Sequence, residues 1–105
     1  MNQVTMHQVT LPRLVGSRES ADQLLESFPP NTLDERLVLN CRELLAASPS
    51  FADEVVKLVL VEGRASELVV LGASDEFAEY IKQSAEARDV FSQVAIRAAG
   101  SEVGA

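Results

Sequence analysis

Two serines, Ser48 and Ser50, flank Pro49 and are followed closely by the acids Asp53 and Glu54. A serine here can cap a helix, which contributes about 1 kcal/mol, or it can carry a phosphate that a partner reads. A phosphate on Ser50 would meet a helix N-terminus, which favours anions, but the two acids would repel it. We predict that Ser50 is the N-cap, that Asp53 takes the capping-box position, and that Ser48 is an exposed loop residue. The two serines and the two acids are our candidates for phosphorylation or partner contact.

The other reactive side chains form no catalytic motif. Cys41 ends a strand-like segment, and the only histidine, His7, lies on a separate amino-terminal segment, so the thiol has no expected base. One His and one Cys with scattered acids are not a zinc motif. Residues 16–17 (Gly-Ser) lack the lysine and the glycine spacing of a P-loop, and Asp53 and Glu54 point apart on a helix. We therefore predict no catalytic residue, no metal and no cofactor, and hence no enzyme.

The composition predicts one domain, residues 1–99, with a flexible tail at 100–105. The chain has 105 residues, of which 47% are hydrophobic and 5% aromatic, enough for one core built from Leu, Val and Ala. The net charge is −7 and the nine Lys and Arg are scattered. This charge disfavours nucleic acid and anionic lipid as partners and favours a basic protein partner.

Three further features favour the cytoplasm. The amino terminus has no signal-peptide pattern, no segment is long enough for a membrane span, and the single cysteine cannot form an internal disulfide.

The hydrophobic pattern predicts strands that alternate with helices. Strands are expected at 3–10 (edge or antiparallel), 36–41, 67–71 and 91–98, and helices at about 17–28, 51–61 and 74–88. Unbroken apolar runs at 37–39 and 68–71 are typical of buried parallel strands. The fold class is therefore α/β, a small mixed, largely parallel sheet with helices packed on it.

The 51–61 helix is apolar on more than one side. Val56 and Leu60 lie outside the core face that Phe51, Val55 and Leu58 define. Internal burial is one explanation, and an apolar docking face, for a partner or in a homodimer, is the other.

Three segments carry a resemblance to a known family. Residues 16–21 (GSRESA) open the first helix, 37–41 (LVLNC) form a strand, and 50–54 (SFADE) open the second helix. Together they resemble the STAS-like domains of anti-sigma factor antagonists, over about three quarters of the chain. The resemblance implies a STAS-like fold and a non-enzymatic switch module that docks onto a partner, often a histidine-kinase-type ATPase, through the loop before the second helix.

The chain departs from the family where the family is phosphorylated. Placed by the pattern, Ser48 occupies the family's Asp position, Pro49 the phosphorylated serine, Ser50 the next serine and Phe51 the glycine. Asn40 stands where a strand-end Asp is common. Kinase-driven switching therefore does not carry over directly.

We expect a cytoplasmic regulatory module that binds a protein partner, such as a histidine-kinase-type ATPase, through residues 48–54. The alternative is a small-ligand or nucleotide sensor, because parallel α/β sheets bind ligands at the carboxyl ends of their strands. Asn40, Cys41 and residues 72–74 (from Gly72 to Ser74) would lie there.

Overall fold

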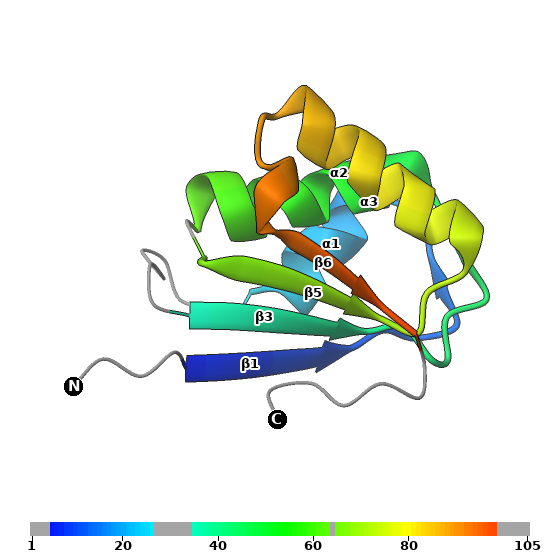
Figure 1. Cartoon of the computed structure of the whole chain (residues 1–105). Helices are drawn as coiled ribbons and strands as arrows, with labels where there is room; N and C mark the ends of the chain where they lie inside the picture. Colours follow the sequence, from blue (N-terminus) through cyan, green and yellow to red (C-terminus); the bar gives the residue numbers. More distant parts are fainter. Residues whose placement is uncertain (1–4, 27–34, 64, 99–105) are drawn as a thin grey trace.

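Four parallel strands form the central sheet of the protein (Figure 1). The computed structural model describes residues 5–26, 35–63 and 65–98. The strands lie in the order β1 (Thr5–Thr10), β3 (Glu35–Asn40), β5 (Glu67–Leu71) and β6 (Val94–Arg97), and every neighbouring pair is parallel. The predicted α/β class with a largely parallel sheet is confirmed.

The unbroken apolar runs of β3 and β5 do form the centre of this sheet. Leu37 and Leu39 of β3 join the main core, and Val38 between them joins a second cluster with Val69 and Leu71 of β5. Successive residues of a strand point to opposite faces, so a run without polar interruptions suits a strand buried on both.

β1 is an edge strand, as expected, but it is parallel rather than antiparallel. Its residues pair in register with β3, for example His7 with Leu37 and Val9 with Leu39. The chain leaves β1, passes through β2 and α1, and returns to begin β3 at the same end. A crossover of this kind, rather than a hairpin, makes the two strands parallel.

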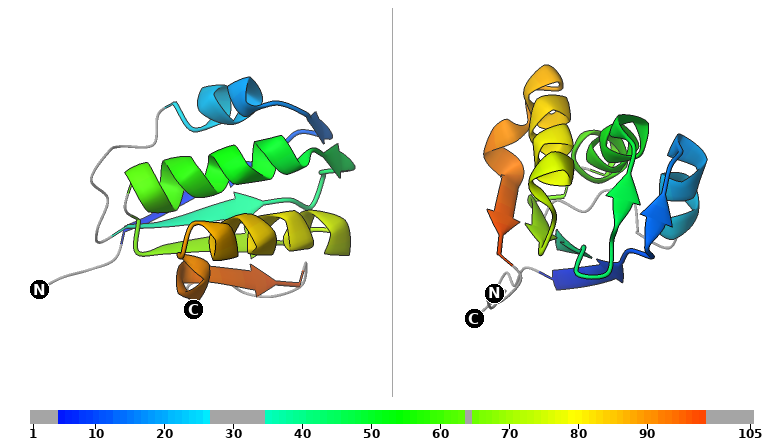
Figure 2. Two further views of the ribbon diagram at one scale, coloured as in Figure 1. Left: turned by 90° about the horizontal axis from the view of Figure 1, so that it is seen from above. Right: turned by 90° about the vertical axis from the view of Figure 1, so that its right-hand side faces the viewer.

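A second, smaller sheet follows the ends of β1 and β3. It consists of β2 (Leu14–Val15) and β4 (Ala46–Ala47), which pair in parallel. Both strands precede a helix directly, and Figure 2 shows them side by side at the end of the molecule where the main strands finish.

The three α-helices pack on one face of the main sheet (Figures 1 and 2). They are α1 (Arg18–Leu24), α2 (Pro49–Val56) and α3 (Asp75–Ala87). α2 lies in the middle, in contact with α1 and with α3. Ser17 and Ser74 cap α1 and α3, because their hydroxyls accept hydrogen bonds from the backbone N–H of Ser20 and Phe77.

The second helix begins earlier than predicted and changes from an α-helix to a π-helix. α2 starts at Pro49 and continues as a π-helix, η1 (Lys57–Glu62), which ends at Gly63. Val56 and Leu60 are 0% and 4% exposed and belong to the main core. Internal burial therefore explains the second apolar side of this helix.

The last strand is shorter than the predicted 91–98. A 3₁₀ turn, η2 (Phe91–Gln93), precedes β6. Within the described ranges, no helix has both the length and the apolar character needed to cross a bilayer. The first helix, predicted over 17–28, already ends at Leu24. The predicted tail at 100–105 lies outside the described residues.

Candidate functional site

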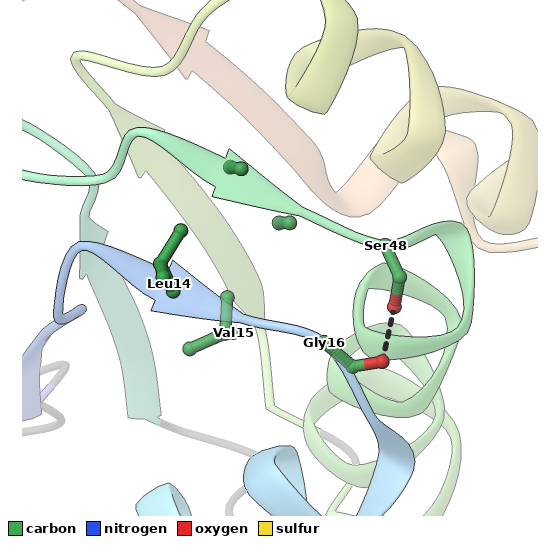
Figure 3. A pocket seen from close by; sticks show the side chains of 6 residues that line it. Leu14, Val15, Gly16 and Ser48 are labelled. Atoms are coloured by element: carbon green, nitrogen blue, oxygen red, sulfur yellow. Dashed lines mark hydrogen bonds between the residues drawn. The ribbon is translucent and has the colours of Figure 1, made fainter.

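Two strand-to-helix junctions lie side by side at the carboxyl end of the main sheet. In one, β2 leads through Gly16 and Ser17 into α1, and in the other β4 leads through Ser48 into α2. The Ser48 backbone N–H donates to the Val15 carbonyl oxygen at 3.2 Å. The Ser48 hydroxyl donates to the Gly16 carbonyl oxygen at 3.0 Å, as Figure 3 shows. The two junctions are therefore joined by hydrogen bonds rather than merely adjacent.

A shallow apolar hollow of about 300 Å³ lies between these junctions (Figure 3). Its lining residues are Leu14, Val15, Gly16, Ala46, Ala47 and Ser48. The side chains on the β4 side are small, which leaves room above the backbone. Leu14 is 70% exposed and the neighbouring Leu45 is 75% exposed. Two exposed leucines beside an apolar hollow form a surface that an apolar side chain of a partner can contact. We call this surface, formed by residues 14–16 and 45–48, the junction surface.

Ser48, not Ser50, is the N-cap of α2. Its hydroxyl accepts a hydrogen bond from the Phe51 backbone N–H at 3.1 Å, and Pro49 takes the first helical position. Proline suits that position because its fixed φ matches the helix and its missing N–H would have had no partner. The expectation that Ser48 is an exposed loop residue was therefore wrong, since it is half-buried and its hydroxyl makes two hydrogen bonds.

Ser50 lies in the first turn of α2 and is exposed. No hydrogen bond to its hydroxyl occurs among the described residues. It is the more accessible of the two serines for modification or partner contact, whereas modification of Ser48 would remove the cap and the bond to Gly16.

Asp53 is held by side chains from both neighbouring helices. Arg88, the C-cap of α3, donates to it twice, at 2.8 Å through Nε and 2.8 Å through Nη2. Ser84 of α3 donates through its hydroxyl at 2.7 Å, and Arg18 of α1 through Nη1 at 2.8 Å. The hydrogen bonds from Arg88 are the main reason why the pKa of Asp53 lies well below its ordinary value, with further lowering from Ser84 and Arg18 against the opposing effect of burial. Asp53 therefore connects α2 to both neighbouring helices and does not act as a capping-box acid.

Glu54 is a buried carboxylate with several partners. It is 4% exposed and accepts from Arg18 Nη1 at 3.2 Å, while Lys57 Nζ lies 3.2 Å away. The Asp22 carboxyl of α1 also interacts with it. Burial acts to raise the pKa of Glu54, but the hydrogen bonds with Asp22, Lys57 and Arg18 outweigh it and lower that pKa. Both predicted acids thus face neighbouring elements of this chain.

The residues of the alternative ligand site lie at the carboxyl ends of the strands of the main sheet. The Cys41 N–H donates to the Leu71 carbonyl oxygen at 2.8 Å, and the Gly72 N–H to that of Arg97 at 2.9 Å. The Asn40 side-chain oxygen accepts from the Arg42 N–H at 3.1 Å, so it serves the local turn.

Cys41 is 1% exposed, and burial raises the pKa of its thiol to about 12. A buried thiol of such high pKa is a poor nucleophile at neutral pH.

A second hollow of about 500 Å³ lies near these strand ends, between the start of α3 and β6. It is lined by Ala73, Asp75, Ala78, Glu79, Lys82, Ile96, Arg97 and Ala98. Of the predicted ligand residues it includes only Ala73. Its lining includes two acids and two bases, so it has no single charge preference.

The described parts of the chain contain no group of three His, Cys, Asp or Glu side chains placed to hold a metal ion. The chain matches no family model, no curated protein and no solved structure. The residues of the site therefore carry the functional argument by themselves.

Sequence reasoning missed the ion-pair network of Arg18, Ser84 and Arg88 around Asp53. No local signal could have revealed it, because these partners lie 31 to 35 positions away along the chain. The hollow had a partial signal, because residues 14–15 and 44–46 stand out as short apolar patches between turns.

Proposed function

We propose that this chain is a non-enzymatic regulatory module that binds a protein partner. The contact would be made by the junction surface together with the start of α2, residues 48–54. The observation that carries this proposal is the apolar hollow between β2 and β4, with Leu14 70% and Leu45 75% exposed beside it. Exposed leucines around a hollow are more consistent with a surface that a partner covers than with a catalytic cleft.

The chemistry of the site also favours binding over catalysis. Ser48 uses its hydroxyl in two hydrogen bonds, and its partners are a backbone carbonyl and a backbone N–H rather than a base. The thiol of Cys41 is buried, and the carboxylates of Asp53 and Glu54 are engaged by basic groups. None of these groups combines an activated nucleophile with an accessible cleft, as acyl or phosphoryl transfer would require.

The kind of partner follows from the charge and from the family resemblance. A net charge of −7 favours a partner with a basic surface and speeds encounter with it. The resemblance to STAS-like anti-sigma factor antagonists points to a histidine-kinase-type ATPase, in the cytoplasm. Switching would come from the nucleotide state of that partner or from modification of Ser50, the accessible serine.

The experiment compares two exposed apolar positions. Leu45→Glu changes the junction surface, and Phe91→Glu changes a residue that is 49% exposed in η2, the turn after α3. Both variants should fold, since neither side chain is in the core. We expect the parent and Phe91→Glu to capture the same protein from native lysate, and Leu45→Glu to fail to capture it. The purified partner should likewise bind the parent and Phe91→Glu, and bind Leu45→Glu weakly or not at all. Equal binding by all three proteins would show that the junction surface is not the binding site.

The ligand-sensor alternative rests on the second hollow, near the carboxyl ends of β5 and β6. Its volume of about 500 Å³ is within the range of small-molecule sites, and Lys82 and Arg97 line it. A screen of nucleotides and metabolites for thermal stabilisation tests it. A ligand whose effect is lost in Arg97→Gln, while Leu45→Glu responds normally, would establish this alternative.

A further inference from the structure

The attachment of α1 to the rest of the fold differs from that of the other helices. Within α1 only Ala21 is buried, with Leu24 half-buried and Leu25, directly after the helix, 6% exposed. The helix has seven residues, far too few to be stable alone in water. Its place on α2 therefore depends on few apolar contacts.

Charged side chains supply much of the remaining contact. Arg18 reaches across to α2, where Nη1 lies 2.8 Å from Asp53 Oδ2 and 3.2 Å from Glu54 Oε1. The Arg18 side chain is 51% exposed, so water and salt compete with these ion pairs.

Two features of this contact oppose it. Arg18 is the first residue of α1, where the positive end of the helix dipole disfavours a cation. The carboxylates of Asp22 in α1 and Glu54 in α2 interact, and they repel each other when both are ionised. The contact thus combines a small apolar area, exposed ion pairs and two unfavourable electrostatic terms.

We propose that α1 detaches from α2 and reattaches in a local opening reaction while the sheet, α2 and α3 stay folded, and that the ion pairs of Arg18 set how often it opens. Local opening reactions have free energies between zero and that of global unfolding, and elements with few buried apolar contacts open most easily. α1 is such an element.

Opening would have a direct consequence for α2. Arg18 would leave Asp53 and Glu54, and the surface of α2 that α1 covers would become accessible. Regulation of partner binding by this step rests on the proposed function, whereas the opening itself does not, since it is a property of the free chain.

The test is native-state hydrogen exchange on the free protein, with no partner present. The amide of Leu25, which donates to the Ala21 carbonyl oxygen at 3.0 Å, reports on α1, and the amides of Val69 and Val70 in β5 report on global unfolding. In the parent, we expect the α1 amide to exchange through an opening reaction with a lower free energy than the one that exposes the β5 amides. In Arg18→Gln, it should exchange on the order of twofold to fivefold faster, the range of an exposed ion pair, with β5 unchanged.

High salt and a neighbouring variant provide the controls. Salt should accelerate exchange at Leu25 in the parent and have little effect in Arg18→Gln, because the screened ion pair is already absent. Glu19→Gln changes an exposed acid on the same helix that has no ion pair among the described residues, and it should keep the salt response of the parent. Exchange of the α1 amide only through global unfolding, or at an unchanged rate in Arg18→Gln, would overturn the proposal. Loss of partner binding in Leu45→Glu tests the proposed function separately.

Discussion

α1 and α3 pack on opposite sides of α2, and an arginine from each side reaches Asp53, but only α3 adds several core side chains. α3 places Phe77, Ile81 and Ala85 in the main core, and its Phe77 ring lies 6.2 Å from that of Phe51 in α2. α1 contributes one small buried residue, Ala21, and reaches α2 with charged groups. Charge screening by salt weakens exposed ion pairs but does not weaken apolar burial. We therefore expect salt to weaken the α1 side, next to the junction surface, more than the α3 side.

The largest expected effect comes from the apolar side of this comparison. Phe77→Ala should lower the free energy of unfolding by about 3–5 kcal/mol, the usual loss for a buried phenylalanine, because Phe77 is 2% exposed against the core. Leu24→Ala on α1 should cost less than half as much, since Leu24 is only half-buried. Urea unfolding measures both values, and equal losses would contradict the contrast between the two helices.

Asp53 joins both sides, so its replacement affects both helices. Asp53→Asn should lower the free energy of unfolding by about 2 kcal/mol at neutral pH, because Arg88 and Arg18 lose their anion. Glu79→Gln, an exposed acid on α3 with no ion pair among the described residues, should stay within about 0.5 kcal/mol of the parent.

The pH dependence of the Asp53 effect has a definite sign. The pKa of Asp53 is lowered from 3.8 on folding, so its stabilisation is complete above the unfolded value and is lost as the pH falls through the folded value. The difference between the parent and Asp53→Asn should therefore shrink in acid below pH 3.8. A constant difference down to strongly acidic pH would show that the ion pairs are not its source.

A third prediction compares the two serines at the start of α2. Ser48→Ala should cost about 1–2 kcal/mol of stability, since it removes the N-cap and the hydrogen bond to Gly16. Ser50→Ala should change stability by less than about 0.5 kcal/mol, as expected for an exposed position. Thermal unfolding of both variants is sufficient, and a larger loss for Ser50→Ala would mean that the cap has been misassigned.

The smallest effect is expected on the charged side, at Asp22. The pKa of Asp22 is raised mainly by its interaction with Glu54. Burial and the charges of Glu54 and Glu62 raise it further, and the charge of Lys57 lowers it. Arg18 reaches the same Glu54 carboxylate. A raised pKa stabilises the fold below the unfolded value of 3.8 and loses that contribution as the pH rises through the folded value. As the pH rises from 3.8 through the folded pKa of Asp22, the protection of the α1 amides against hydrogen exchange should therefore fall, after correction for the intrinsic exchange rate.

Asp22→Asn keeps a hydrogen-bond donor toward Glu54 at every pH and should abolish this fall. Glu19→Gln, on the same helix, should retain it. If the pH profile of Asp22→Asn matched that of the parent, Asp22 would not be the source of the pH dependence of α1.

Much of the fold was predictable from local pattern. The runs at 37–39 and 68–71 have no polar interruption and became the two central strands, because only a strand covered on both faces buries consecutive apolar residues. The predicted helix start at 17 and helix end near 61 lie close to the observed ones, since short-range backbone geometry governs both features.

A local signal did favour Ser48 over Ser50 as the N-cap, because Pro49 suits the first helical position. The second hydrogen bond of the Ser48 hydroxyl was not predictable locally, since its acceptor, the Gly16 carbonyl oxygen, lies 32 positions away and comes close only where β2 and β4 pair. In the same way, the sequence places Asp53 near the start of a helix, but only the packing of α1 and α3 against α2 brings it Arg18 and Arg88. Composition, strand pattern and most helix ends depend on neighbours along the chain, whereas the partners of each polar side chain depend on which distant segments the core brings together.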